Sequence, residues 1–466
     1  MPESPAFRTT LQVIEGSPGL APLITRLSES YVSWEEFMTL PTPRDMTSRE
    51  SWELLTAVFR AQGTAFPFGP DGIAYAGGQS APGGPVDPHL QPNYWYHNTL
   101  ETNSVGATLF GHCMRESGLF SRLTDSRNAE ITVRLQVDEI IAAAALDGVT
   151  LPVRSAHSVP HLQRPPRGAS DRLVYSVLAT VRDLPTYAGH PITPDLILHL
   201  HERLLDTVEL DRLSLGSPRS GLTRQAIPVT GSDTPAPEEA SRRVGVLASY
   251  LDWALASPAA DPLVIALLIP EMFRSLLPLR NMNNQVGRVL LRLFAINAGM
   301  PVLGMLPLSM TKVSWLEGHY TEGPLGHTPA YFVASHGDDA RDITGTVTLA
   351  IRIAEQALED LSEALRRQAE RDEDLRSLVQ RDPELNHRQR SILGRALRDP
   401  EAEFLIAYHR QTHNVVYATA RADLLGLVER GYLKMNERGR TFVFTPRPNL
   451  HEYIEATYAS EPPLPR

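Results

Sequence analysis

Apolar residues recur every three or four positions along most of the chain, which is the spacing of one helix face. The run over 289–301, VLLRLFAINAGMP, follows this pattern and ends at Gly299 and Pro301, two residue types that stop helices. The same spacing predicts further helices, among them 48–63, 131–148 and 192–208. We therefore expect a mainly α protein.

Segments rich in glycine and proline separate the helical stretches. Residues 68–93 contain GPDGIAYAGGQSAPGGPVDPHLQP, a composition typical of a loop or linker. Residues 385–447 differ in character, because three short helical stretches with a turn at Asn414 precede two strands. The sequence thus predicts three regions: a helical N-terminal region with the linker (1–94), a helical core (95–380) and a small C-terminal domain (385–450).

The composition is that of a globular protein. The chain has 466 residues, of which 42% are hydrophobic and 21% charged. Its net charge of −10 argues against contact with nucleic acid or an anionic membrane over the whole surface. Cys113 is the single cysteine, so no internal disulfide forms. We find no signal peptide and no apolar run of the roughly 18 residues that a spanning helix needs, and we expect a cytoplasmic protein without a membrane partner.

A polar turn precedes the helix over 289–301. The stretch Leu277–Arg288 reads LPLRNMNNQVGR, and its asparagines lead directly into the start of that helix. A helix N-terminus leaves backbone N–H groups without partners inside the helix, and such groups hold anions well. The turn is therefore the first candidate for a binding site.

The stretch Leu277–Arg288 resembles the signature of the Fic (Fido-domain) family, HPFxDGNGRxxR followed by a leucine-rich helix. In that family the His takes a proton from a target hydroxyl and the Asp holds magnesium. The glycine-rich backbone and two arginines bind phosphates, and AMP moves from ATP to a protein side chain. The resemblance implies a helical Fic core with a short β-hairpin flap. It also implies that a retained nucleotide site is lined by Asn283, Asn284, Gln285, Gly287 and Arg288.

Most of the family's chemistry is missing at the corresponding positions. Leu277 stands where the family has His and cannot accept a proton, a task usually worth about 10²–10⁴ in rate. Asn281 stands for the Asp and offers a neutral oxygen where magnesium prefers a carboxylate. Gln285 stands for the first Arg, while Met282 and Asn284 stand for glycines, Met being the harder fit to a left-handed turn. We therefore expect no AMP transfer and no bound metal, and at most a nucleotide such as ATP in the cleft.

The predicted helix over 131–148 resembles the family's inhibitory helix, which ends in SxxxEG and whose Glu pairs with the second signature Arg. The matching residues here are Ala143, Asp147 and Gly148. One interpretation retains a regulatory ion pair between Asp147 and Arg288. In the other, Asp147 merely precedes a glycine that caps the helix. We favour the ion pair, because both ends keep their charge.

Three further segments extend the resemblance. Residues 214–237 resemble the flap that clamps a target peptide, so we expect a hairpin near 221–232 and a protein partner there. His201 matches a His in a family helix, and we interpret it as a core or hydrogen-bonded side chain. The charged amphipathic stretch over 339–379 also allows a homodimer, although its apolar heptad fades after Leu365.

The C-terminal domain resembles a winged helix-turn-helix, a DNA-binding module that many Fic proteins carry. Between His387 and Arg440, ten Lys and Arg residues face six Asp and Glu residues, a local balance of +4. Contact with the DNA backbone needs such locally gathered positive charge. We expect DNA contacts from the third helix and the wing: Tyr417, Thr419, Arg421, Arg438 and Arg440. In the alternative, this domain packs on the core or on another protein.

No other motif supplies a catalytic or metal site. His409 and His413 lie four residues apart on one helical face, and we interpret them as polar surface residues rather than metal ligands. Three functions remain. The one we favour is a DNA-binding or ligand-sensing regulator without AMP transfer. The others are a nucleotidyltransferase with altered chemistry and a protein-interaction scaffold.

Overall fold

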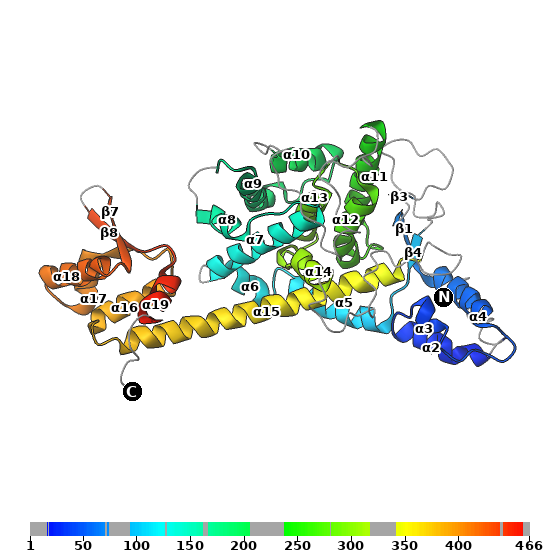
Figure 1. The fold of residues 1–466 in the computed structure, drawn as a ribbon, viewed down its shortest axis with the longest axis horizontal. Helices are drawn as coiled ribbons and strands as arrows, with labels where there is room; N and C mark the ends of the chain where they lie inside the picture. Colours follow the sequence, from blue (N-terminus) through cyan, green and yellow to red (C-terminus); the bar gives the residue numbers. More distant parts are fainter. Residues whose placement is uncertain are drawn as a thin grey trace. The chain divides into compact units, whose positions relative to one another are not determined.

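The computed structural model describes residues 16, 18–69, 72–73, 94–125, 128–161, 166–205, 237–279, 281–316, 342–438 and 441–459. Helices predominate in these ranges beside small antiparallel sheets, which confirms the predicted mainly α class (Figure 1). The chain forms two compact units. Unit 1 comprises residues 1–120 and 134–359, and unit 2 comprises residues 121–133 and 360–466. The division falls inside one helix, α15 (Thr344–Arg381), earlier than the boundary at 380 that the sequence predicted.

The N-terminal part of unit 1 is a small helical cluster with short strands. Its apolar side chains, including Leu20, Phe37, Trp52 and Leu55, pack into one core. A capping box in which the Thr47 side chain accepts the N–H of Glu50 starts its longest helix. The elements are η1 (Pro18–Leu20), α2 (Ala21–Glu29), α3 (Trp34–Phe37), α4 (Ser48–Gln62), β1 (Thr64–Phe66), β2 (Phe68–Gly69), β3 (Gly72–Ile73) and β4 (Tyr94–Tyr96). Strand β1 pairs with β4 and β2 with β3, both antiparallel.

A series of helices follows and builds the main body of unit 1. They are α5 (Leu100–Cys113), α6 (Gly118–Thr124), α7 (Ala129–Leu146), α8 (Val153–Ala156), η3 (Val159–His161), α9 (Ala169–Asp183), η4 (Leu184–Tyr187) and α10 (Pro194–Leu205). After the gap in the description come α11 (Pro237–Ala256), α12 (Pro262–Leu276), α13 (Asn283–Asn297), η6 (Leu303–Met305) and α14 (Leu308–Leu316). The chain enters unit 2 within α6 and returns to unit 1 within α7.

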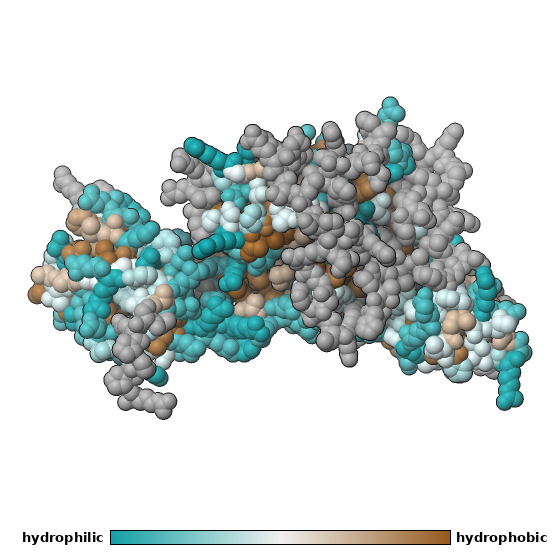
Figure 2. All heavy atoms as spheres, in the orientation of Figure 1, coloured by the Kyte–Doolittle hydropathy of each residue, from teal (hydrophilic) through white to brown (hydrophobic). Residues whose placement is uncertain are grey.

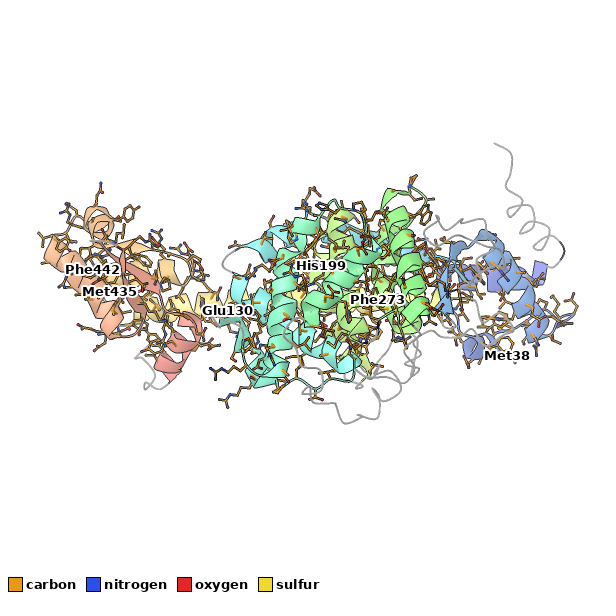
Figure 3. The ribbon with its side chains drawn as sticks, turned by 90° about the horizontal axis from the view of Figure 1, so that it is seen from above. Met38, Glu130, His199, Phe273, Met435 and Phe442 are labelled. Carbon is orange, nitrogen blue, oxygen red and sulfur yellow. The ribbon has the colours of Figure 1, made fainter. Side chains whose placement is uncertain are left out.

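Helix α13 lies at the centre of unit 1, in contact with α9, α10, α11 and α12 (Figure 1). Every residue from Asn283 to Ala295 is buried. Gly287 permits the close approach of α12, because a Cβ at that position would lie 3.1 Å from the Cα of Pro270 and 3.3 Å from the Cβ of Phe273. Figure 3 labels Phe273 among the helices of this core. The polar turn at the start of α13 therefore lies in the buried core of unit 1.

Unit 2 has its own core, to which α15 contributes Leu375 and Val379. Its elements are α16 (His387–Ala396), β6 (Phe404–Leu405), α17 (Ile406–His413), α18 (Tyr417–Glu429), β7 (Leu433–Arg438), β8 (Thr441–Pro446) and α19 (Leu450–Ala459). The sheet order is β6-β8-β7, and Met435 on β7 faces Phe444 on β8. Asn414 makes the turn between α17 and α18 with a left-handed φ of 48°. The predicted succession of three helices, a turn and two strands is present.

Two predictions concern features beyond these elements. The flap hairpin over 221–232, with its possible protein contact, lies outside the residues that the structure describes. Among the helices that are described, none combines the length and the apolar character needed to cross a membrane.

Candidate functional sites

The turn between α12 and α13 has a backbone that its residues adopt only at a cost. Leu277 and Met282 have φ values of 44° and 57°, both in the left-handed region. This region usually costs a residue with a side chain about 1–2 kcal/mol. The strain expected at Met282 is therefore present, and burial of the Met282 side chain holds it in place. Asn281 Oδ1 accepts a hydrogen bond from His201 Nε2 at 2.9 Å, so His201 is a hydrogen-bonded residue.

Asp147, the residue after α7, fills the N-terminal end of α13 with its carboxylate. Its Oδ1 accepts hydrogen bonds from the backbone N and the side-chain Nδ2 of Asn284, both at 3.0 Å. Its Oδ2 accepts from the backbone N of Gln285 at 3.1 Å. Burial raises the pKa of Asp147 to about 7, although the N–H donors act in the opposite direction. The Asp147 carboxyl group thus accepts the N–H groups that the sequence predicted to be free.

The predicted ion pair between Asp147 and Arg288 is wrong. Arg288 lies one turn further into α13 and pairs with Glu139 of α7, with 2.6 Å between Nε and Oε1 and both side chains 7% exposed. The Asp147 carboxylate points instead at the end of α13, where the first N–H groups emerge along the helix axis. The alternative interpretation is correct for Gly148, which follows α7 with a left-handed φ of 77°, but it misses the cap that Asp147 places on α13.

Glu139 joins three helices through one buried carboxylate. Besides pairing with Arg288, it accepts hydrogen bonds from the backbone N of Ser309 at 2.9 Å and of Met310 at 3.0 Å, in the first turn of α14. Arg288 in turn donates from Nη2 to the carbonyl oxygen of Leu306 at 2.9 Å. Sequence reasoning missed Glu139. The signal was available, because it is an acidic residue directly before the apolar run IIAAAAL.

The other residues of the predicted nucleotide site make contacts within the protein. Asn283 exchanges two hydrogen bonds with the backbone of Leu279, at 3.1 and 3.0 Å. Gln285 donates from Nε2 to the carbonyl oxygen of Ile140 at 2.7 Å. Gly287 is the position where α12 and α13 approach each other. These polar groups therefore stabilise the junction of α7, α12 and α13.

A cavity of about 20 Å³ lies beside this junction, lined in part by Glu139, Gln285, Arg288 and Arg292. That volume holds roughly one water molecule, whereas pockets for small ligands are usually about 300 Å³ or more. Among the residues that the structure describes, Arg288 Nη1 has no hydrogen-bond partner. The cavity as it stands has no room for a nucleotide.

A second group of buried charges lies between α12 and α14. Lys312 pairs with Glu271, and Arg274 Nε lies 2.9 Å from the other oxygen of Glu271. Burial alone would raise the pKa of Glu271, but the two cations outweigh it and the pKa is lowered. Burial lowers the pKa of Lys312 to about 8. Sequence reasoning did not single out these residues, although a Glu inside the run LVIALLIPEMF was a signal.

In unit 2, Asp423 of α18 connects three helices. It accepts hydrogen bonds from Arg388, with 2.6 Å between Nε and Oδ2, from Asn386 at 2.8 Å and from His409 at 3.1 Å. Burial alone would raise the pKa of Asp423, but these donors lower it. His409 is therefore buried, contrary to the interpretation of a surface residue, and its ring centroid lies 4.7 Å from that of His413. No metal-holding group of three or more His, Cys, Asp or Glu occurs in the described part of the chain.

The outer face of α18 carries the predicted DNA contacts of the third helix. Tyr417 is 51% exposed, Arg421 is exposed, and Thr419 is half-buried and so less accessible than expected. The 17 residues from Ile406 to Ala422 contain no Asp or Glu. This segment therefore contributes no carboxylate to the surface, in a chain whose net charge is −10.

The wing residues are placed less favourably than expected. Arg438 on β7 is exposed, but its guanidinium pairs with Glu403, with 3.1 Å between Nη1 and Oε2. The charge of Arg438 is thus partly offset within the protein. Arg440 lies outside the residues that the structure describes. Lys434 on the same strand is exposed and, among the described residues, forms no ion pair.

Figure 2 shows hydrophobic residues among hydrophilic ones over the part of unit 2 where Figure 1 draws α17, α18 and the two strands. Among the described residues, three of the most exposed large apolar or aromatic side chains lie there: Tyr408, Val416 and Tyr417. A search of protein-family models finds no match to the chain, and a search of curated proteins finds none either.

Proposed function

We propose that this protein is a DNA-binding regulator. In this proposal unit 2 is a winged helix-turn-helix that binds duplex DNA through α18, and unit 1 is a Fic-like core that does not transfer AMP. The observation that carries the DNA-binding part is the exposed surface of α17 and the start of α18. It presents Arg410 and Arg421 to solvent and no carboxylate over 17 residues.

The charge of this surface favours a polyanion. In the rest of the small domain most arginines are committed within the protein, as Arg388 is to Asp423 and Arg438 to Glu403. Among the described residues, Arg410 and Arg421 form no ion pair, so their charge is available to phosphates. The local concentration of positive charge also explains how a chain of net charge −10 would bind DNA at one place.

The geometry of unit 1 supports a core without transferase activity. Leu277 offers no base, and the N–H groups of Asn284 and Gln285 that would meet a phosphate already bind Asp147. Any nucleotide in this cleft would have to displace that carboxylate from the end of α13. The Fic-like identity of unit 1 rests on the signature-like turn and the helix that follows it.

A titration of labelled duplex DNA with the full-length chain at several salt concentrations tests the proposal. We expect binding that weakens as salt rises, with log K falling by about 0.9 for each phosphate contact. Arg421→Ala should weaken binding about 5- to 150-fold on a preferred sequence and little on random DNA, since a bidentate base contact is usually worth about 1–3 kcal/mol.

Arg367→Ala is the matched control, because Arg367 on α15 is an exposed arginine of unit 2 that pairs with Glu363 on its own helix. This variant should bind as the wild type does. Absence of binding to any duplex at low salt, with the chain folded, would refute the proposal and favour a protein-contact module.

A further inference from the structure

We infer that the exposed apolar residues at the start of α18 read thymine methyl groups in the major groove, so that thymines form part of the preferred DNA site. This inference rests on the proposed DNA binding and adds the chemistry by which the surface selects a sequence. It names Val416 and Tyr417 as residues that determine specificity, with Arg421 beside them.

The exposed positions of α18 form one continuous face. Tyr417, Ala418, Arg421 and Ala422 are exposed and lie one turn apart in pairs, so they share a side of the helix. Val416, the residue before the first turn, is 69% exposed. The opposite side of α18 is buried in the core of unit 2 through Ala420, Leu424 and Leu427. The exposed face is thus rigidly positioned.

The side chains of this face determine which groups on a base edge they can contact. Four of its five residues present methyl groups or an aromatic ring, and none presents an amide or a carboxylate. In the major groove the thymine C5-methyl is the apolar group, whereas adenine and cytosine are usually read by amides and carboxylates. Arg421, one turn along, matches the two acceptors of a guanine. The face therefore fits a site in which thymines lie next to a guanine.

The surroundings of the face favour DNA over a protein partner. Tyr408 on α17 is 61% exposed, and the exposed charged residues between it and Ala422 are both basic, Arg410 and Arg421. A protein partner would need carboxylates of its own at the right places to pair with these two arginines. DNA always has phosphates on both sides of the major groove, and these pair with the arginines directly. Exposed apolar side chains that are contiguous usually mark a contact surface.

The experiment replaces thymidine by deoxyuridine, which removes the C5-methyl group of the base and changes nothing else. A randomised duplex pool is first selected with the full-length wild type, and each thymine of the selected duplex is then replaced in turn. Burial of one methyl group changes binding about four-fold, so at least one replacement should weaken binding by about that factor. Replacements outside the protected site should have no effect.

Four variants locate the effect. Val416→Ala or Tyr417→Ala should remove most of the sensitivity to deoxyuridine at one position. Arg421→Ala should weaken binding but keep that sensitivity. Val153 is an exposed valine of unit 1, and Val153→Ala should leave the whole profile unchanged. Val416 is exposed, so its replacement should not affect folding.

The outcomes separate the inference from the proposed function. Tight binding that no deoxyuridine replacement changes would overturn the inference and leave DNA binding in place. A deoxyuridine effect that Val416→Ala and Tyr417→Ala both leave intact would also overturn it. Failure to bind any duplex would overturn the proposed function and the inference together.

Discussion

Removal of the Glu139 carboxylate should be among the most damaging single changes in unit 1. In Glu139→Ala, Arg288 stays buried and loses its partner, which usually costs about 3–5 kcal/mol. The same change deprives α14 of the acceptor for the N–H groups of Ser309 and Met310, which should add about 1 kcal/mol. Because domains are usually stable by only about 5–15 kcal/mol, a large part of the stability of unit 1 should be lost.

Double-mutant cycles distinguish the two acidic residues of this region. Glu139→Ala and Arg288→Met should interact by more than about 1 kcal/mol, because removal of both charges leaves no unpaired ion. Asp147→Ala should cost about 1–3 kcal/mol by leaving N–H groups unsatisfied. Its effect should add to that of Arg288→Met within about 0.5 kcal/mol, since Asp147 caps the helix and does not pair with Arg288.

The assay is urea unfolding of the full chain, followed by circular dichroism and tryptophan fluorescence. The chain has two units, so only the transition that the substitutions shift is fitted. A cost below about 1 kcal/mol for Glu139→Ala would refute the reasoning. So would a strong coupling between Asp147 and Arg288 together with none between Glu139 and Arg288.

Four further outcomes follow from the structure. The pKa of Asp147 is raised to about 7, so the folded state holds a proton that the unfolded state releases; stability should fall by roughly 4 kcal/mol as pH rises from about 4 to 7, and Asp147→Asn should flatten this profile in unfolding experiments. Gly287→Ala forces a Cβ against the backbone of α12 and should lower stability by about 1–3 kcal/mol in the same assay. Glu403→Gln frees the guanidinium of Arg438 and should steepen the salt dependence of DNA binding by up to about 0.9 in slope, whereas an unchanged slope would place Arg438 away from phosphates. The wild-type chain incubated with labelled ATP and cell extract should yield no labelled protein band. A labelled band that Arg288→Ala abolishes would favour the hypothesis of a nucleotidyltransferase with altered chemistry.

Local patterns in the sequence predicted where the helices lie, because periodicity and stop signals are local properties. Helix α13 nevertheless begins at Asn283, inside the stretch that was predicted to be a turn. Asn297 ends α13 close to the predicted stop at Gly299, and the helices and strands of unit 2 follow the predicted order around Asn414. The left-handed turn at Met282 was also foreseeable from a glycine position in the resemblance. The flap region remains a prediction.

Pairings between distant residues were not predictable to the same degree. Asp147 and Glu139 lie two turns apart on the same segment. Both are acidic, so charge alone does not indicate which of them pairs with Arg288. The packing of the helices determines the pairing. Asp147 at the end of α7 lies at the start of α13, whereas Glu139, two turns earlier on α7, lies beside Arg288 in the second turn of α13. Burial of His409 was missed for a similar reason, because its acceptor Asp423 comes from another helix.

Hydrogen exchange of the full-length chain, with and without a saturating selected duplex, tests the central claim most directly. The account predicts slower amide exchange in peptides that cover 406–422, and a smaller effect in those that cover 433–438. Peptides from α13 and from its contact with Asp147 should exchange at the same rate with or without DNA. Protection confined to unit 1, or no protection anywhere with the duplex bound, would contradict the assignment of α18 as the DNA-reading element.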